Sequence, residues 1–189
     1  EEFQMFEKDL PGGNTTGFGG QEVANHLPLE TCETINDAWG FNITDQNYKS
    51  VKQLIHYLVR DAGFGANFLL NVGPMPNGEI QKEFTERLAA IGEWLKVNGT
   101  TIYGTKGGFM KPQPWGAITQ KGNIVYLHIL NSPGEKMLIK MPAKVRSARL
   151  FINKTPVSFE ALAENYVVLD LSKVKLDEID TIIEVEISK

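Results

Sequence analysis

The segment GANFLLNVGP, residues 65–74, decides the fold of this sequence. Within it, residues 66–72 form a nearly continuous apolar run, which Gly73 and Pro74 bring to an end. A short apolar run bounded by turn residues is typical of a parallel strand that is buried on both faces. We therefore predict such a strand at 66–72, and its neighbours indicate the kind of sheet around it.

Helical periodicity flanks this strand on both sides. Over residues 51–59 the apolar side chains recur at i, i+3, i+4, i+7 and i+8, which predicts an amphipathic helix ended by Gly63 and Gly65. Residues 81–98 have a second apolar face, and Gly99 follows at the position where a helix usually ends. The strand is expected to lie between two helices, as in an α/β fold.

The first part of the sequence extends the same alternation. Residues 2–7 alternate like a strand, and residues 29–36 read as a second short strand. Glycine and proline are frequent enough in 10–28 to predict a loop there. Strand, loop, strand, helix, strand, helix is the order of parallel α/β folds, which keep catalytic loops at the carboxyl ends of their strands. Because the sequence opens within a strand, we expect a piece of a longer protein.

The pattern changes near residue 108, where the sequence predicts a domain boundary. After it only strand signals remain, at even spacing, which favours an antiparallel β-sandwich over residues 109–189. The predicted strands are 116–120, 124–130, 137–141, 148–152, 157–160, 166–171 and 181–187. The sequence therefore divides into an α/β part, 1–108, and an all-β part.

Composition excludes several classes of function. The chain of 189 residues has 19 basic and 23 acidic side chains, so a net charge of −4 offers no field for nucleic acid or an anionic membrane. No apolar run approaches the roughly 20 residues of a membrane helix. The three histidines lack metal-ligand spacing, and the lone Cys32 is expected to be a small buried residue. We expect no cofactor and no metal.

Three residues could carry chemistry. Glu7 ends the first strand, where α/β folds hold acids and bases, although a solvated surface carboxylate is an equal alternative. Glu30 lies on the next strand, as a second acid or as a carboxylate that fixes a loop. Trp39 follows that strand and could form an apolar wall for a ligand, although residue statistics favour a core position. Carboxylates with a tryptophan suggest a neutral polyol such as a sugar.

Five motifs in order then give a resemblance. They are PLETCETINDAWGFN (28–42), GANFLLNVGP (65–74), NGEI (77–80), RL followed by IGEWL (87–95), and NG followed by IYG (98–104). This set resembles the α-L-fucosidases of glycoside hydrolase family 29, and the bacterial members most. The resemblance implies that residues 1–108 are the C-terminal portion of a (β/α)8 catalytic barrel and residues 109–189 a C-terminal β-sandwich.

The resemblance also implies a reaction. Family members release terminal α-L-fucose with retention, which needs two carboxyl groups about 5 to 5.5 Å apart. Matched by motif, Glu7 corresponds to the acid/base, whereas the nucleophilic Asp lies upstream of this sequence. Trp39 corresponds to an aromatic residue that packs against the apolar side and methyl group of fucose, and Glu30 to a supporting carboxylate. The glycine-rich loop 12–20 would form a rim of the pocket.

The implied partners are a fucosylated oligosaccharide or glycoconjugate and the N-terminal remainder of the barrel. Without that remainder the chain is expected to be inactive. Family members are usually periplasmic or secreted, so we expect either compartment. An alternative function is a non-catalytic sugar-binding or scaffolding module, although Trp115, Tyr126 and Tyr166 of the sandwich are scattered in the sequence.

Overall fold

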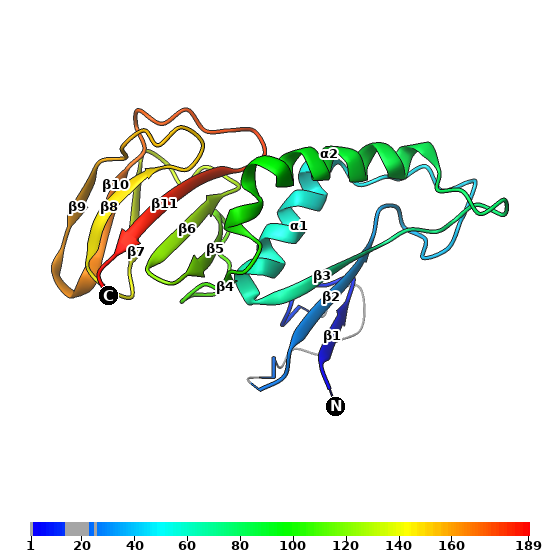
Figure 1. Ribbon diagram of the computed structural model, residues 1–189, viewed down its shortest axis with the longest axis horizontal. Coiled ribbons are helices and arrows are strands. Elements are labelled where there is room, and N and C mark those ends of the chain that lie inside the picture. The colour runs from blue at the N-terminus through cyan, green and yellow to red at the C-terminus, as the bar shows by residue number, and fades with distance from the viewer. Residues whose placement is uncertain (1, 14–22, 25) are drawn as a thin grey trace. The chain divides into compact units, whose positions relative to one another are not determined.

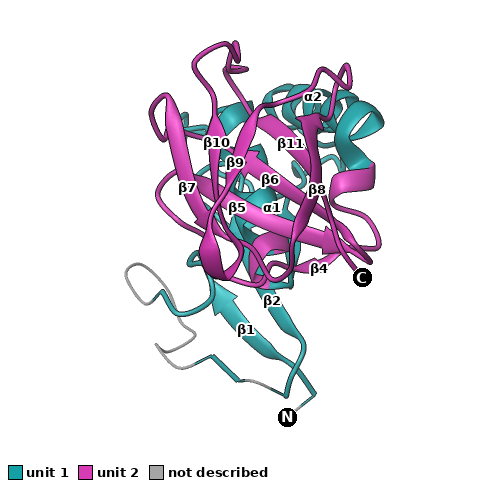
Figure 2. Ribbon diagram, turned by 90° about the vertical axis from the view of Figure 1, so that its left-hand side faces the viewer, with its two compact units in different colours: residues 1–61, 65–99 teal, residues 62–64, 100–189 magenta. Residues whose placement is uncertain are grey.

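The computed structural model describes residues 2–13, 23–24 and 26–189. The chain forms two compact units (Figures 1 and 2): unit 1 comprises residues 1–61 and 65–99, and unit 2 comprises 62–64 and 100–189. Most of the glycine-rich loop 12–20 lies outside the described residues, so its predicted role as a pocket rim stays a prediction.

Unit 1 contains a three-stranded parallel sheet. Its strands are β1 (Gln4–Glu7), β2 (Leu29–Thr34) and β3 (Ala66–Asn71), in the spatial order β1-β2-β3. Both pairs are parallel and in continuous register. The three strands predicted in this part of the sequence are confirmed, each to within a few residues.

Two helices accompany the sheet, α1 (Val51–Phe64) and α2 (Lys82–Asn98). The prediction that Gly63 ends α1 is wrong, because the helix continues through it to Phe64, and Gly65 follows with φ +74°. Gly99 has a right-handed φ of −57°, so it does not form a left-handed stop after α2. After α2 the chain instead continues into the short 3-10 helix η1 (Gly99–Thr101).

Helix α1 covers one face of the sheet. On that face Phe6 is fully buried and Phe68 stacks on Tyr57 of α1, with ring centroids 6.2 Å apart. On the opposite face Met5 is 44% exposed and Leu69 is 45% exposed. The prediction that β3 is buried on both faces is therefore wrong for the described residues, because none of them covers this second face fully.

Unit 2 is an antiparallel β-sandwich. One sheet has the order β4-β5-β6-β11-β8 and the other has the order β7-β10-β9. Their bounds are Lys106–Gly107 (β4), Gly116–Lys121 (β5), Ile124–Ile129 (β6), Lys136–Lys140 (β7), Val145–Leu150 (β8), Phe159–Ala161 (β9), Tyr166–Asp170 (β10) and Thr181–Ile187 (β11), with the 3-10 helix η2 at Ala163–Asn165. The predicted strands after residue 108 are all present, within a few residues.

One apolar core joins the two sheets of unit 2. It contains Leu127 and Ile183 from the larger sheet and Ile139 and Leu169 from the smaller, all at most 4% exposed. Each such side chain stabilises the fold by about 1.5 to 3 kcal/mol through its burial. Because β4 pairs with β5, residues before the predicted boundary at 108 also belong to this unit.

A chain of polar side chains crosses the larger sheet. Nδ1 of His128 lies 2.7 Å from Oδ2 of Asp180, and both side chains are 0% exposed. Nε2 of His128 lies 3.3 Å from the hydroxyl of Thr119, which donates to the carbonyl of Thr101 at 2.6 Å. Because the His128–Asp180 pair is fully buried, its role is structural: each buried polar side chain supplies the hydrogen-bond partner that the other needs.

Candidate functional site

Glu7 and Trp39 meet at the carboxyl edge of the parallel sheet. Glu7 is the last residue of β1, and Trp39 lies in the turn after β2. The indole Nε1–H of Trp39 donates to Oε1 of Glu7 at 3.0 Å. Trp39 is 38% exposed, so the alternative of a core tryptophan is wrong. The carboxyl ends of parallel strands are where α/β folds bind ligands, so this pair is the candidate site.

Two neighbours hold Trp39 in place. Asn71, at the end of β3, donates its side-chain N–H to the carbonyl of Trp39 at 2.7 Å. Nζ of Lys8 lies 5.2 Å from the centre of the indole and donates to the carbonyl of Asp37 at 2.6 Å. The indole is thus fixed through its ring, its N–H and its backbone.

Gly73 lets the turns after β2 and β3 approach each other. A Cβ placed on Gly73 would lie 2.5 Å from the carbonyl carbon of Gly40 and 2.6 Å from the backbone nitrogen of Phe41. Real Cβ atoms do not come so close to backbone, so position 73 has no room for a side chain. A Cβ on Gly40 would meet nothing within 4 Å.

Gly73→Ala is therefore expected to displace the turn that carries Trp39. The added methyl meets backbone, which cannot rotate away, so we expect a loss of about 1 to 3 kcal/mol in stability. The indole N–H resonance of Trp39, measured by NMR, should shift as the bond to Glu7 lengthens. Gly40→Ala is the matched control and should leave that resonance in place, whereas equal effects of the two variants would contradict the steric argument.

The hydrogen bond determines how Glu7 presents its carboxyl group. An indole N–H can only donate, so it occupies Oε1 as an acceptor whether Glu7 is ionised or protonated. A transferable proton then resides on Oε2. The arrangement can deliver a proton to, or take one from, a ligand that rests beside Trp39.

Glu30 takes a different position on the same face of the sheet. It pairs in register with Met5, whereas Glu7 pairs with Cys32. Glu30 therefore lies two residues nearer the amino end of β2 than the partner of Glu7, and the structure does not place it at the Glu7–Trp39 contact. Its predicted role as a substrate-binding residue stays a prediction.

Cys32 follows Glu30 by two residues on β2 and pairs in register with Glu7 of β1. It is buried, as predicted. Burial, with the charges of Glu7 and Glu30, raises the pKa of the Cys32 thiol. The thiol is therefore neutral and weakly nucleophilic at physiological pH.

Sequence reasoning missed Lys8 and Asn71. Asn71 belongs to the motif at 65–74, and a polar residue at the carboxyl end of a parallel strand is a signal of a site. Lys8 has φ +53°, an uncommon conformation that only the structure reveals.

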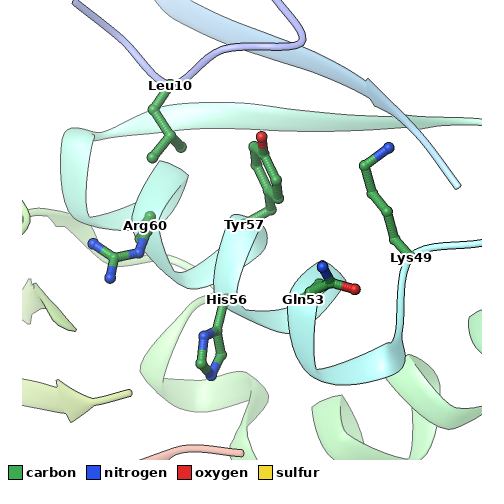
Figure 3. A pocket seen from close by; sticks show the side chains of 6 residues that line it. All are labelled: Leu10, Lys49, Gln53, His56, Tyr57 and Arg60. Atoms are coloured by element: carbon green, nitrogen blue, oxygen red, sulfur yellow. The ribbon is translucent and has the colours of Figure 1, made fainter. Parts of the chain in front are cut away.

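Unit 1 also has a cavity beside α1 (Figure 3). Its volume is about 440 Å³. Lys49 and Arg60 give it a basic lining, and His56 and Tyr57 line it too. Nζ of Lys49 lies 3.3 Å from a carboxylate oxygen of the buried Glu33. Among the described residues, no group of three His, Cys, Asp or Glu side chains could hold a metal ion.

Asp61, another buried acid of α1, should make the stability of unit 1 depend on pH. Burial raises the pKa of its carboxyl to about 8, and the charge of Glu33 adds to the rise. The unfolded chain releases this proton near pH 4, so the folded state binds the extra proton between about pH 4 and 8. Stability should therefore fall across this window, by at most about 1.4 kcal/mol per pH unit.

Asp61→Asn should flatten this dependence. We expect the variant to lose less stability than the parent between pH 5 and pH 8, as measured by urea unfolding followed through the helical circular dichroism signal. Glu86→Gln, an exposed change on α2, should keep the slope of the parent. An unchanged slope in Asp61→Asn would show that other groups cause it.

Comparisons with known proteins identify the family to which the chain belongs. The family model for alpha-L-fucosidase matches residues 1–100. The α-L-fucosidase isoenzyme 1 of Paenibacillus thiaminolyticus is 31% identical with a TM-score of 0.83, over 100% of this chain and 45% of that one. The Thermotoga maritima α-fucosidase solved in complex with fucose is 28% identical with a TM-score of 0.71, over 85% of this chain and 40% of that one. Human plasma α-L-fucosidase is 29% identical over 163 residues, which are 79% of this chain and 34% of that protein.

These matches place the chain among the glycoside hydrolases. Within that class it belongs to the α-L-fucosidase family, glycoside hydrolase family 29, so the resemblance found in the sequence is confirmed. The chain spans about a third of the length of the human relative and less than half of the two solved enzymes.

Proposed function

We propose that this chain supplies the acid/base half of a retaining α-L-fucosidase site. Glu7 protonates the leaving oxygen of a terminal α-L-fucoside from Oε2, then takes a proton from the water that releases the sugar. The nucleophilic Asp comes from a part of the enzyme outside this chain. The observation that carries the proposal is the hydrogen bond between Trp39 and Glu7 at the carboxyl edge of the sheet.

We further propose that unit 1 is the C-terminal portion of a (β/α)8 barrel. Consecutive parallel strands lie side by side in chain order, and α1 covers one face of the sheet, as in one sector of such a barrel. The other face carries Met5 and Leu69, and Phe3 shares their alternation at 46% exposure. This face corresponds to the barrel interior, and the remainder of the barrel is the partner that covers it.

Trp39 has two roles: it contacts the substrate, and it positions Glu7. Its exposed ring offers an apolar surface to one side of fucose while its N–H positions the carboxyl group. Fucosylated oligosaccharides or glycoconjugates are the proposed substrates, and the solved complex of the Thermotoga maritima enzyme with fucose supports that sugar. We also propose a periplasmic or secreted location, where such glycans are found.

Trp39→Phe separates the two roles. The ring platform remains but the donor is lost, so kcat should fall by about tenfold, as expected for a hydrogen bond to a charged group, with little change in KM. Trp39→Ala should raise KM as well. Both are measured on the enzyme that joins this chain to the rest of its barrel, and an unchanged kcat in Trp39→Phe would argue against positioning of Glu7 by the indole.

Hydrolysis of 4-nitrophenyl α-L-fucoside tests the proposed function. The joined enzyme should release fucose, and NMR should show the α-anomer first, because the mechanism retains configuration. The 189-residue chain alone should be inactive. Initial release of the β-anomer, or full activity of the chain alone, would overturn the proposal.

A further inference from the structure

Unit 2 has a groove of its own where β7 ends and β10 begins. Its cavity volume is about 680 Å³. One wall comes from the paired residues Lys140 of β7 and Tyr166 of β10. The lining also includes Phe109, Met110 and Trp115, in the segment that leads into β5. The groove therefore joins residues that are far apart in the sequence.

The base of the groove is apolar and aromatic. Ile139 and Met141 line it and are buried, with 4% and 2% exposure. Phe109 and Trp115 pack partly against the core of the sandwich while also lining the groove. Trp115 and Tyr166, scattered in the sequence, thus line one cavity together.

The rim is polar but carries little net charge. Lys140 is the one charged residue that lines the groove among those described. Its Nζ lies 5.2 Å from the centre of the Tyr166 ring and 3.7 Å from a carboxylate oxygen of Glu164. This neighbour offsets the charge of Lys140, so the groove does not favour an anion.

Asn165 completes the rim from a fixed backbone position. It has φ +62°, and its carbonyl accepts a hydrogen bond from the backbone N–H of Met141 at 3.0 Å. Its exposed side-chain amide has both a donor and an acceptor, as does the hydroxyl of Tyr166. Such groups match a ligand that carries several hydroxyls.

We infer that this groove binds a neutral sugar unit. A pyranose has an apolar face of C–H groups and a rim of hydroxyls, which fit Trp115 and the Asn165 side of the groove respectively. The sugar is a unit other than the one cleaved at Glu7, so the inference does not depend on the proposed catalytic function. Unit 2 would then hold glycan as well as form a compact domain.

Tryptophan fluorescence tests the inference on the 189-residue chain. Trp39→Phe combined with Trp94→Phe leaves Trp115 as the sole indole. Titration with lactose and with fucosyl-lactose should shift the emission of Trp115 to shorter wavelength in a saturable way. Because no hydrolysis is measured and Trp39 is absent, failure of this test is distinct from failure of the fucosidase proposal.

Asn165→Gly is the decisive variant in this background. Glycine tolerates positive φ, so the change removes the amide without straining the backbone. We expect sugar affinity to fall at least about fivefold, the effect of one hydrogen bond. Tyr103→Ala, an exposed aromatic residue that does not line the groove, should leave affinity unchanged.

Four results would overturn the inference, and the first three concern sugar binding. They are no saturable shift with either sugar, an equal shift with glycerol, and an unchanged affinity in Asn165→Gly. A shift with an added peptide but not with sugar would assign the groove to a protein partner and would also overturn it.

Discussion

Glu7→Gln is expected to reduce kcat/KM of the joined enzyme by about 10²- to 10⁴-fold on a fucosylated oligosaccharide. The amide keeps the acceptor oxygen for the Trp39 N–H but has no proton to transfer. A sugar leaving group is a poor one and needs protonation, whereas 4-nitrophenolate leaves with little help. The loss should therefore be smaller for bond cleavage in 4-nitrophenyl α-L-fucoside, and the ratio of the two losses identifies the acid.

Glu7→Ala gives an independent readout. With 4-nitrophenyl α-L-fucoside, azide should restore part of the turnover, because this anion attacks the fucosyl-enzyme without a general base. Glu2→Gln, an exposed carboxylate of the same segment, serves as the matched control and should keep parental activity. Equal losses on both substrates, or no response to azide, would remove Glu7 from the acid/base role.

Asp180→Leu should cost unit 2 about 3 to 5 kcal/mol in its free energy of unfolding. The carboxylate of Asp180 lies 2.7 Å from Nδ1 of His128 with both side chains fully buried, so its loss leaves a buried imidazole without its acceptor. Urea unfolding followed by the emission of Trp115, the one tryptophan of unit 2, measures the change. The variants Trp39→Phe and Trp94→Phe again provide the background.

Two further variants test whether the loss of stability comes from the buried His128–Asp180 pair or from the loss of any carboxylate. Asp170→Asn removes a carboxylate that hydrogen-bonds Ser172 on the surface, and it should change stability little. Replacing both His128 and Asp180 by Leu should recover much of the loss, because an apolar pair of similar volume avoids the cost of desolvation. An unchanged unfolding curve in Asp180→Leu would mean that the hydrogen bond between His128 and Asp180 does not stabilise unit 2.

Sequence periodicity predicted most elements because it reflects burial directly. The run at 66–72 and the apolar face at 81–98 became β3 and α2 almost residue for residue. Periodicity could not predict that Leu69 is exposed, because an apolar run indicates only that a face of the strand favours burial, not which residues bury it. It also could not show that Gly63 would stay helical, since a single glycine costs a helix only about 1 kcal/mol.

The site was predictable in its residues and not in its contacts. Glu7 and Trp39 were each identified by their positions after a strand, yet they are 32 residues apart and only the register of β1 and β2 brings them together. The same register separates Glu30 from them. The convergence of Trp115 and Tyr166 on one groove likewise follows from strand pairing that no local pattern reports.

The contact between Gly40 and Gly73 has a consequence for how such sequences diverge. A side chain added at position 40 meets open space, so substitutions of Gly40 carry no steric penalty. Position 73 cannot accept a side chain, because its obstacle is the backbone of Gly40 and Phe41, which no replacement of their side chains removes. Replacement of Gly73 by another residue would require an insertion or deletion in the turn after β2, which contains Gly40 and Phe41. The length of that turn and the residue at position 73 should therefore change together among related sequences.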